Sequence, residues 1–215
     1  GYKDIYDFSK MVKKHDVIVV RINYRLGPFG WFYHPAIQGL QNGIDKTSNF
    51  GTLDIISALK WVNQNIELFG GDPENITIFG ESAGGHNVLS LIVSEKANGL
   101  FHKAISMSGY TTTINQEKSY KQDKQSSTSD FSSWNVMNMI LDDKNLPEIQ
   151  EGFSKNELRD ILLTLSTEDF FKHFSNREPY QELPLLQSDG IVIPKQGLRK
   201  ALSNPKYIKD IPVIA

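Results

Sequence analysis

The sequence contains no cysteine, no long hydrophobic run and no excess of basic charge. Without cysteine among its 215 residues, the chain cannot form disulfides, thiol nucleophiles or cysteine–zinc sites. No apolar run approaches the ~20 residues that a membrane-spanning helix needs. The formal net charge is −2 and the 23 Lys and Arg residues are dispersed, so we expect neither a membrane span nor a nucleic-acid partner. Its 39% hydrophobic residues suit a globular chain with one buried core.

The two ends of the chain are typical of a part of a longer domain. The sequence starts at Gly1 without Met, and its first residues, GYKDIYDFSKMVKKHD, are too charged for a signal peptide. It stops at DIPVIA, which is typical of a buried strand that has only begun. Because domains seldom end inside an apolar strand, we expect the chain to be a fragment.

Apolar runs and helical periodicities alternate along the first half of the chain. Residues Asp16 to Tyr24, DVIVVRINY, form a continuous apolar run typical of a parallel strand buried on both faces. The next segment has the apolar spacing of one helical face, at Ile55, Leu59, Val62 and Ile66. Lys103 to Ser108, KAISMS, is a further candidate strand. This alternation predicts an α/β fold with a mostly parallel sheet and flanking helices, and it places catalytic groups at the carboxyl ends of the strands.

Beyond Gly109 the sequence changes to a polar connection and short helices. Residues 115–133 are polar and serine-rich, which favours an exposed connection over a binding site. Ser154 and Glu157 have the spacing of a helix capping box, and Thr167 is the candidate cap of another helix. That helix carries Phe170, Phe171 and Phe174, which we interpret as helix packing, with an acyl pocket as the alternative. We therefore expect one domain over residues 1–215, with a sheet core (1–110), a polar connection and helical insertion (111–182) and a return towards the sheet (183–215).

The stretch TIFGESAGGHNVLSLIV contains the pattern G-x-S-x-G around Ser82. A short β-prone run precedes the serine, and apolar residues at helical spacing follow it. A strand, a tight turn and a helix are the context of a nucleophile elbow, in which backbone strain exposes the hydroxyl and the next N–H faces the same space. Ser82 is thus the candidate nucleophile, and the backbone N–H of Ala83 is a candidate oxyanion donor.

The glycines around Ser82 have a steric role in this interpretation. We expect a side chain at Gly80 or Gly84 to collide with the neighbouring strand or helix, and Gly85 to give further room. The alternative is a glycine-rich turn that binds a phosphate at the helix N-terminus. Such turns normally show G-x-G-x-x-G or a terminal G-K-[ST], and the stretch has neither.

A family resemblance is carried by four segments: VIVVRINYRLGPFGW, NFGTLDIISALKWVNQNIELFGGDPENITIFGESAGG, LFHKAISMSG and PLLQSDGIVIP. In this order they resemble the type-B carboxylesterase and cholinesterase-like branch of the α/β-hydrolases, from about residue 16 to residue 110 and again near Leu183 to Ala215. The wording GESAGGHNV and the lack of cysteine look more like the bacterial members. The resemblance implies an α/β-hydrolase fold, partial in this chain, and Ser82 as the nucleophile. It further implies hydrolysis of a small carboxylic ester without cofactor or metal.

The resemblance also implies which parts of the site are absent. Family members carry an H-G-G-G-like loop before the INYRLG strand, and their triad acid and histidine lie well downstream of DIPVIA. We therefore expect neither of these two triad residues in this chain. SMSG corresponds to a segment usually written S-Q-S-G, whose second serine, here Ser108, lies behind the triad as a supporting residue. Met107 replaces the usual glutamine of that segment.

Two other functions are compatible with the same resemblance. One is a non-catalytic cholinesterase-like binding or adhesion module, although such modules typically lack a working nucleophile. The other is a different serine hydrolase of the same fold, such as a lipase or a peptidase. The family resemblance is compatible with a secreted or periplasmic location, and the sequence fixes neither the compartment nor the oligomeric state.

None of the five histidines is expected to be the triad base. The triad order in this fold is serine, acid, histidine, which His15 and His34 contradict because they precede Ser82. His86 is too close to Ser82 in sequence to reach its hydroxyl, so we expect it to face solvent or to pack at the helix terminus. His102 begins a strand, at the end opposite the site, and His173 lies in a helical segment.

The charged residues near the motif have mainly structural interpretations. Glu81 is a candidate supporting residue that pairs with Arg25, with a solvated charge as the alternative. Asp54 and Asp72 are typical of a helix start and a turn. Asp189, in the sequence SDG, is favoured as a turn former over a triad acid.

Overall fold

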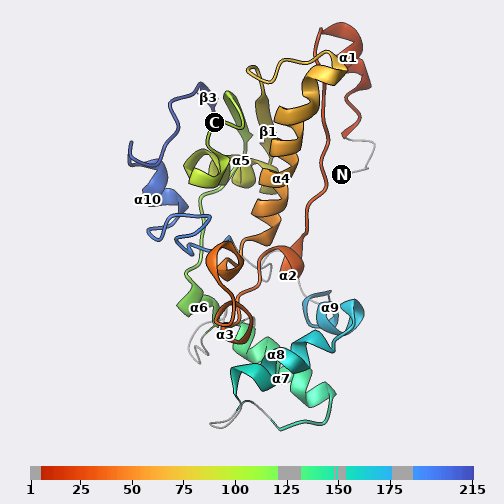
Figure 1. Cartoon of the computed structure of the whole chain (residues 1–215), viewed down its shortest axis with the longest axis vertical. Helices are drawn as coiled ribbons and strands as arrows, with labels where there is room; N and C mark the ends of the chain where they lie inside the picture. The colour runs from red at the N-terminus through yellow and green to blue at the C-terminus, as the bar shows by residue number, and fades with distance from the viewer. Residues whose placement is uncertain (1–5, 121–131, 148, 150–153, 176–185) are drawn as a thin grey trace.

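The structure is a computed structural model that describes residues 6–120, 132–147, 149, 154–175 and 186–215. Within these ranges it has one sheet of parallel strands, ordered β1 (Thr77–Glu81), β2 (Lys103–Met107) and β3 (Val213–Ile214) (Figure 1). Glu81 lies opposite Met107, so β1 and β2 end at the same edge of the sheet. The expected parallel α/β sheet is therefore confirmed.

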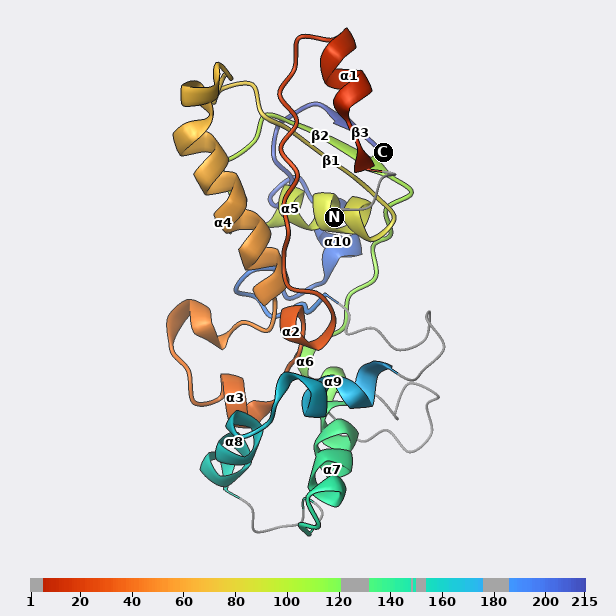
Figure 2. The same ribbon diagram turned by 90° about the vertical axis from the view of Figure 1, so that its right-hand side faces the viewer.

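Most helices lie against one face of this sheet or at the opposite end of the molecule, whereas α1 lies apart, at the top of the view in Figure 2. In chain order they are α1 (Ser9–Lys14), α2 (Gly27–Gly30), α3 (Pro35–Gln38), α4 (Phe50–Asn65), α5 (Ala83–Val93), α6 (Gln116–Tyr120), α7 (Ser133–Asp143), α8 (Lys155–Leu163), α9 (Thr167–Ser175) and α10 (Leu198–Leu202). Short 3-10 turns lie at Gly43–Lys46, Ile66–Phe69 and Glu95–Ala97. No helix of the described ranges is long and apolar enough to cross a membrane.

Burial of the sheet is one-sided. α5 packs across β1 and β2, and α4 and α10 pack against α5. Ile78 and Ala104 face α5 and are 8% and 1% exposed, whereas Phe79, on the other face of β1, is 39% exposed. The predicted apolar face of α4 and the turn after it is confirmed, since its four residues are buried: Ile55 and Leu59 in this same core, and Val62 and Ile66 beyond it.

The apolar run from Asp16 to Tyr24 is not a strand in the structure. It runs between α1 and α2 without regular secondary structure or a pairing partner among the described residues (Figure 2). Ile18 and Val20 are 46% and 41% exposed. The expectation of a doubly buried strand is therefore wrong for this chain, because β-prone side chains favour an extended backbone but a strand also needs the N–H and C=O groups of a neighbour.

The predicted strand in DIPVIA is present but differs in burial. Val213 pairs with Ala104 and Ile214 with Ile105, both in parallel register. The two side chains of β3 are 42% and 67% exposed, so the expectation that this strand is buried is wrong. In the described residues β3 is an edge strand, and no helix packs over its side chains.

The insertion forms a second apolar core at the end of the molecule away from the sheet (Figure 1). α8 begins with the predicted capping box, because Ser154 Oγ accepts from the Glu157 N–H at 3.2 Å and Glu157 Oε2 accepts from the Ser154 N–H at 2.8 Å. The cap of α9 is one residue earlier than predicted. Ser166 Oγ accepts from the Asp169 N–H at 3.1 Å, so Thr167 is inside the helix rather than its cap.

The aromatic residues of α9 pack on α2 and its C-terminal flank. Phe170 has ring contacts with Phe29 and Phe32, at centroid distances of 5.7 and 5.1 Å, and Phe171 stacks on Phe29 at 6.3 Å. For these two residues the interpretation as helix packing is confirmed. The Phe174 side chain and residues 121–131 of the polar connection lie outside the described residues.

Candidate active site

Ser82 lies between β1 and α5 in a backbone conformation that L-residues rarely adopt. Its φ is 55° and its ψ is −113°, and the residue is exposed. β1 ends at Glu81 and α5 begins at Ala83, so the predicted strand, tight turn and helix are confirmed. A non-glycine residue held at positive φ costs free energy of order 1–3 kcal/mol, and such strain clusters at functional sites.

The backbone around Ser82 combines a fixed turn with an unpaired donor. The Ser82 N–H donates to the Met107 carbonyl at 2.9 Å, which ties the turn to the end of β2. The first hydrogen bond inside α5 runs from the His86 N–H to the Ser82 carbonyl at 2.9 Å. Ala83 occupies the first position of the helix, where the N–H has no intrahelical acceptor. An exposed serine hydroxyl and a free N–H at a helix N-terminus therefore lie in consecutive residues.

Glycine is required at Gly80 and Gly85. Of the two positions predicted to collide, Gly80 and Gly84, only Gly80 does. A Cβ on Gly80 would lie 2.5 Å from the backbone carbon of Gly84, and a Cβ on Gly85 would lie 2.7 Å from the Met107 carbonyl oxygen. A Cβ on Gly84 would meet no atom within 4 Å. The prediction that a side chain at Gly84 collides is therefore wrong, because it is the Gly80 Cβ direction that points at the first turn of the helix.

The segment after β2 supports the turn from the neighbouring strand. Ser108 follows β2 at the same edge as Ser82, is exposed and has a φ of 51°. Ser106 lies two residues earlier, inside β2. It is 5% exposed, and its Oγ donates to the Gly85 carbonyl at 3.1 Å. Ser108 is a predicted supporting residue and Ser106 is not, although the alternation of side chains along a strand places Ser106 on the buried face with Ala104.

The opposite end of α5 is held by Lys209, which no sequence pattern indicates. Its Nζ donates to the carbonyls of Ile92 and Ser94, at 3.2 and 2.7 Å. Burial lowers the pKa of Lys209 to about 8, and the negative charge of Glu95 opposes this shift. A cation at a helix C-terminus satisfies otherwise unpaired carbonyls, so Lys209 fixes the helix that carries Ser82.

His102 and His173 lie in structural positions away from Ser82. His102 precedes β2, so it is separated from the Ser82 edge by the length of that strand, and its Nδ1 accepts from the Ile76 N–H at 3.2 Å. His173 Nε2 lies 3.0 Å from Asp143 Oδ2 in the contact between α9 and α7. Nearby Lys172 and His173 lower the pKa of Asp143.

The three remaining histidines also have partners or positions of their own. His15 is exposed at the end of α1. His34 is fully buried, its Nδ1 accepts from the Ala36 N–H at 3.1 Å, and burial lowers its pKa to about 4. His86 is 6% exposed, so of its two expected positions packing at the helix terminus is confirmed and the solvent-facing one is wrong. No hydrogen bond joins any described histidine to Ser82 Oγ.

Arg25 does not pair with Glu81. Its guanidinium binds both carboxylate oxygens of Asp54, with Nε–Oδ2 at 2.8 Å and Nη2–Oδ1 at 2.7 Å, and lies over the Phe50 ring. This hydrogen bonding raises the pKa of Arg25 and lowers the pKa of Asp54. The predicted Glu81 brace is therefore wrong, because Asp54 offers a two-point contact from the first turns of α4.

Asp189 forms a turn, as predicted. Its Oδ1 accepts from three consecutive backbone N–H groups, those of Ile191, Val192 and Ile193, at 3.0 to 3.1 Å. Its other oxygen accepts from the Thr47 hydroxyl. With both oxygens occupied and 7% exposure, Asp189 organises the turn before α10 and cannot orient a catalytic histidine.

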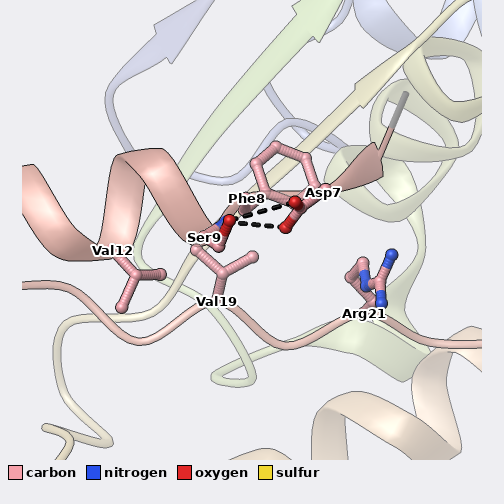
Figure 3. A pocket seen from close by; sticks show the side chains of 6 residues that line it. All are labelled: Asp7, Phe8, Ser9, Val12, Val19 and Arg21. Atoms are coloured by element: carbon pink, nitrogen blue, oxygen red, sulfur yellow. Dashed lines mark hydrogen bonds between the residues drawn. The ribbon is translucent and has the colours of Figure 1, made fainter. Parts of the chain in front are cut away.

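The described ranges contain no group of three or more histidine, aspartate and glutamate side chains that could hold a metal. A hollow of about 170 Å³ lies between α1 and the segment that follows it, lined by Asp7, Phe8, Ser9, Val12, Val19 and Arg21 (Figure 3). Asp7 accepts two hydrogen bonds from Ser9 there, and no residue of the Ser82 turn lines this hollow.

The parallel sheet with an exposed, strained serine between a strand and the helix that packs on it defines an α/β-hydrolase. Comparisons with known proteins agree with this class and narrow it. The sequence profile described as the carboxylesterase family matches residues 1–214. The chain belongs to this family.

Individual relatives show the extent of the likeness. Over 118 residues the chain is 46% identical to the para-nitrobenzyl esterase of Bacillus subtilis (strain 168), which covers 55% of this chain and 23% of that protein. It is 36% identical to carboxylesterase 1E of Rattus norvegicus over 199 residues, 91% of this chain and 33% of that protein. A solved structure named PNB esterase superposes with a TM-score of 0.75 at 32% identity, over 99% of this chain and 41% of the other. The chain thus spans less than half the length of these relatives.

Proposed function

We propose that this chain carries the nucleophile of a serine carboxylic-ester hydrolase. Ser82 Oγ attacks the carbonyl carbon of a small-molecule ester, the alcohol leaves, and water hydrolyses the acyl-enzyme. The observation that carries this proposal is the exposed, strained conformation of Ser82 at the start of α5, with φ at 55°. The names of the relatives, a para-nitrobenzyl esterase and carboxylesterases, support an ester as the substrate class.

The neighbouring residues have separate roles in this proposal. The Ala83 N–H points from the helix N-terminus and donates to the oxyanion that forms in the transition state. Gly80 and Gly85 allow the strand, the helix and the end of β2 to approach closely, and Ser108 supports the site from the next strand. The histidine and the acid come from sequence beyond these 215 residues, and the reaction uses neither a cofactor nor a metal.

The test is active-site labelling of the protein as its gene encodes it. We expect a fluorophosphonate to label Ser82, and Ser82→Ala to abolish labelling and lower kcat on p-nitrophenyl butyrate about 10⁴-fold or more. Ser57→Ala is the matched control, because Ser57 is an exposed serine on α4 whose hydroxyl bonds only the Leu53 carbonyl. Labelling that survives Ser82→Ala would rule out Ser82 as the nucleophile. An unlabelled, inactive wild type would favour a non-catalytic binding module.

A further inference from the structure

His86 joins the helix that carries Ser82 to the segment that follows β2. Its imidazole lies against the Tyr110 ring, with 4.2 Å between ring centroids and a tilt of 40°. The nearby Thr112 backbone partly opposes the lowering of the His86 pKa by burial. His86 is 6% exposed, so the ring contact is made inside the protein. One side chain in the first turns of α5 therefore contacts the segment 108–112.

This segment has few other means of attachment to the helix. It has no regular secondary structure, and it begins at Ser108 with a φ of 51°. Where it passes α5, the backbones are too close for side chains, since a Cβ on Gly85 would lie 2.9 Å from the Gly109 Cα. Beyond this close approach the two side chains His86 and Tyr110 meet.

The position of the segment determines the position of the Ser82 backbone. Met107 is the last residue of β2, and its carbonyl accepts the Ser82 N–H at 2.9 Å. A shift of the chain at Ser108 and Gly109 therefore moves the acceptor that holds Ser82 in its strained conformation. Strained conformations persist only where the surroundings over-determine them, and this hydrogen bond is part of those surroundings.

We propose that His86 is a positioning residue for the Ser82 nucleophile: by packing on Tyr110, it fixes the segment 108–112 and thereby the backbone of Ser82 and Ala83. This role deepens the proposed ester hydrolysis and rests on it. His86 does not touch the reacting atoms, because its imidazole packs on Tyr110.

The kinetic test uses the protein as its gene encodes it and three variants. His86→Leu removes the planar polar ring, His86→Asn retains a planar polar group, and His34→Leu is the matched control. His34 is also a fully buried histidine, but its polar contact is local, from the Ala36 N–H. We expect His86→Leu to lower kcat on p-nitrophenyl butyrate about tenfold with KM nearly unchanged, because small displacements of a reacting group cost rate steeply. His86→Asn recovers most of kcat, and His34→Leu retains it at the same folded fraction.

A second measurement separates this inference from the proposed function. Amide hydrogen exchange in peptides covering residues 81–86 and 106–112 reports the same contacts in an active or inactive protein. We expect His86→Leu to speed exchange in both peptides about tenfold, with His34→Leu leaving them unchanged. Unchanged exchange in His86→Leu, or a kcat loss that His86→Asn does not reverse, would overturn the inference. A wild type without esterase activity would refute the proposed function, while the exchange data would still decide whether His86 positions the turn.

Discussion

Two apolar segments of this chain, β1 with its helix α5 and the run Asp16 to Tyr24, differ in what surrounds them. Ile78 of β1 is 8% exposed because β2 pairs with the strand and α5 covers it. Val20, in an equally β-prone run, is 41% exposed and pairs with no described strand. The two segments meet where Asn87 Nδ2 donates to the Tyr24 hydroxyl at 3.1 Å.

The difference shows that local sequence and pairing contribute separately to a strand. β1, its turn and α5 are adjacent in sequence, and the partner β2 follows within 26 residues of the start of β1, from Thr77 to Lys103. The run Asp16 to Tyr24 has the composition of a strand but no such neighbour. The Ser82 unit, which comprises β1, the turn at Ser82 and α5, therefore finds its strand partner β2 nearby in the sequence. The run Asp16 to Tyr24 has no such partner in the described residues.

The largest expected effect tests whether the Ser82 unit suffices for catalysis. We expect the 215-residue chain, expressed alone, to hydrolyse p-nitrophenyl esters about 10⁴-fold more slowly than the protein as its gene encodes it, since a serine without its base is a weak nucleophile. The measurement is kcat/KM of both purified proteins, each with its Ser82→Ala variant. Fast turnover by the short chain that depends on Ser82 would show that these residues contain a complete triad.

The next effect compares two adjacent glycines of the Ser82 unit. Gly85→Val should destabilise the protein by about 3 kcal/mol or more, because its Cβ meets the backbone at Met107 and Gly109, which cannot move independently. Gly84→Ala should be neutral or stabilise by up to about 1 kcal/mol, because the Cβ is unobstructed and alanine favours helix. Urea unfolding of both variants measures the difference. Equal costs at the two positions would contradict the close approach of α5 to β2.

Features set by neighbouring residues were predictable from the sequence. The turn around Ser82, the buried face of α4 and the capping box at Ser154 each depend on residues within a few positions of one another. The Asp189 turn is of the same kind, since the carboxylate bonds N–H groups two to four residues later. Local hydrogen bonds and periodicity therefore recovered α4, α5, α8 and α9, four of the ten described helices, and the frame of the candidate site.

Features that depend on distant residues were not predictable. Arg25 binds Asp54 rather than Glu81. This choice of partner depends on how α4 packs against the segment after Tyr24. Lys209 reaches the end of α5 from more than 100 residues away, with separations of 117 and 115 residues to its two acceptors. The burial of His86 against Tyr110 likewise depends on the path of the chain after β2.

One buried and one exposed substitution in the 215-residue chain compare the two segments directly. Ile78→Ala should lower the free energy of unfolding by about 2–5 kcal/mol, the usual cost of deleting a buried aliphatic side chain. Val20→Ala should cost less than about 0.5 kcal/mol, as at other exposed positions. Urea unfolding followed by circular dichroism provides both values. A Val20→Ala cost as large as that of Ile78→Ala would mean that the run is buried in solution.

The smallest expected effect comes from a titratable group that the Ser82 unit buries, whereas the charged residues of the run, Asp16 and Arg21, are exposed. Burial lowers the pKa of His86 from 6.5 to about 4, so the unfolded chain takes up a proton at a higher pH than the folded protein. The stability that comes from this difference is therefore fully present above the unfolded pKa and is lost as the pH falls from about 6.5 towards 4. Between about pH 7 and pH 5.5 we expect His86 to contribute a loss of about 1 kcal/mol in the free energy of unfolding.

The measurement for His86 compares how steeply the free energy of unfolding changes with pH in the wild type and in His86→Leu. The contributions of the other titrating groups cancel in this difference. Urea unfolding at several pH values should show a smaller loss of stability towards acid in His86→Leu than in the wild type. His34→Leu should give a similar reduction, because burial also lowers the pKa of His34 to about 4. Identical slopes in His86→Leu and the wild type would show that His86 is solvated in solution, and the contrast between a buried Ser82 unit and an exposed run would then be smaller than the structure indicates.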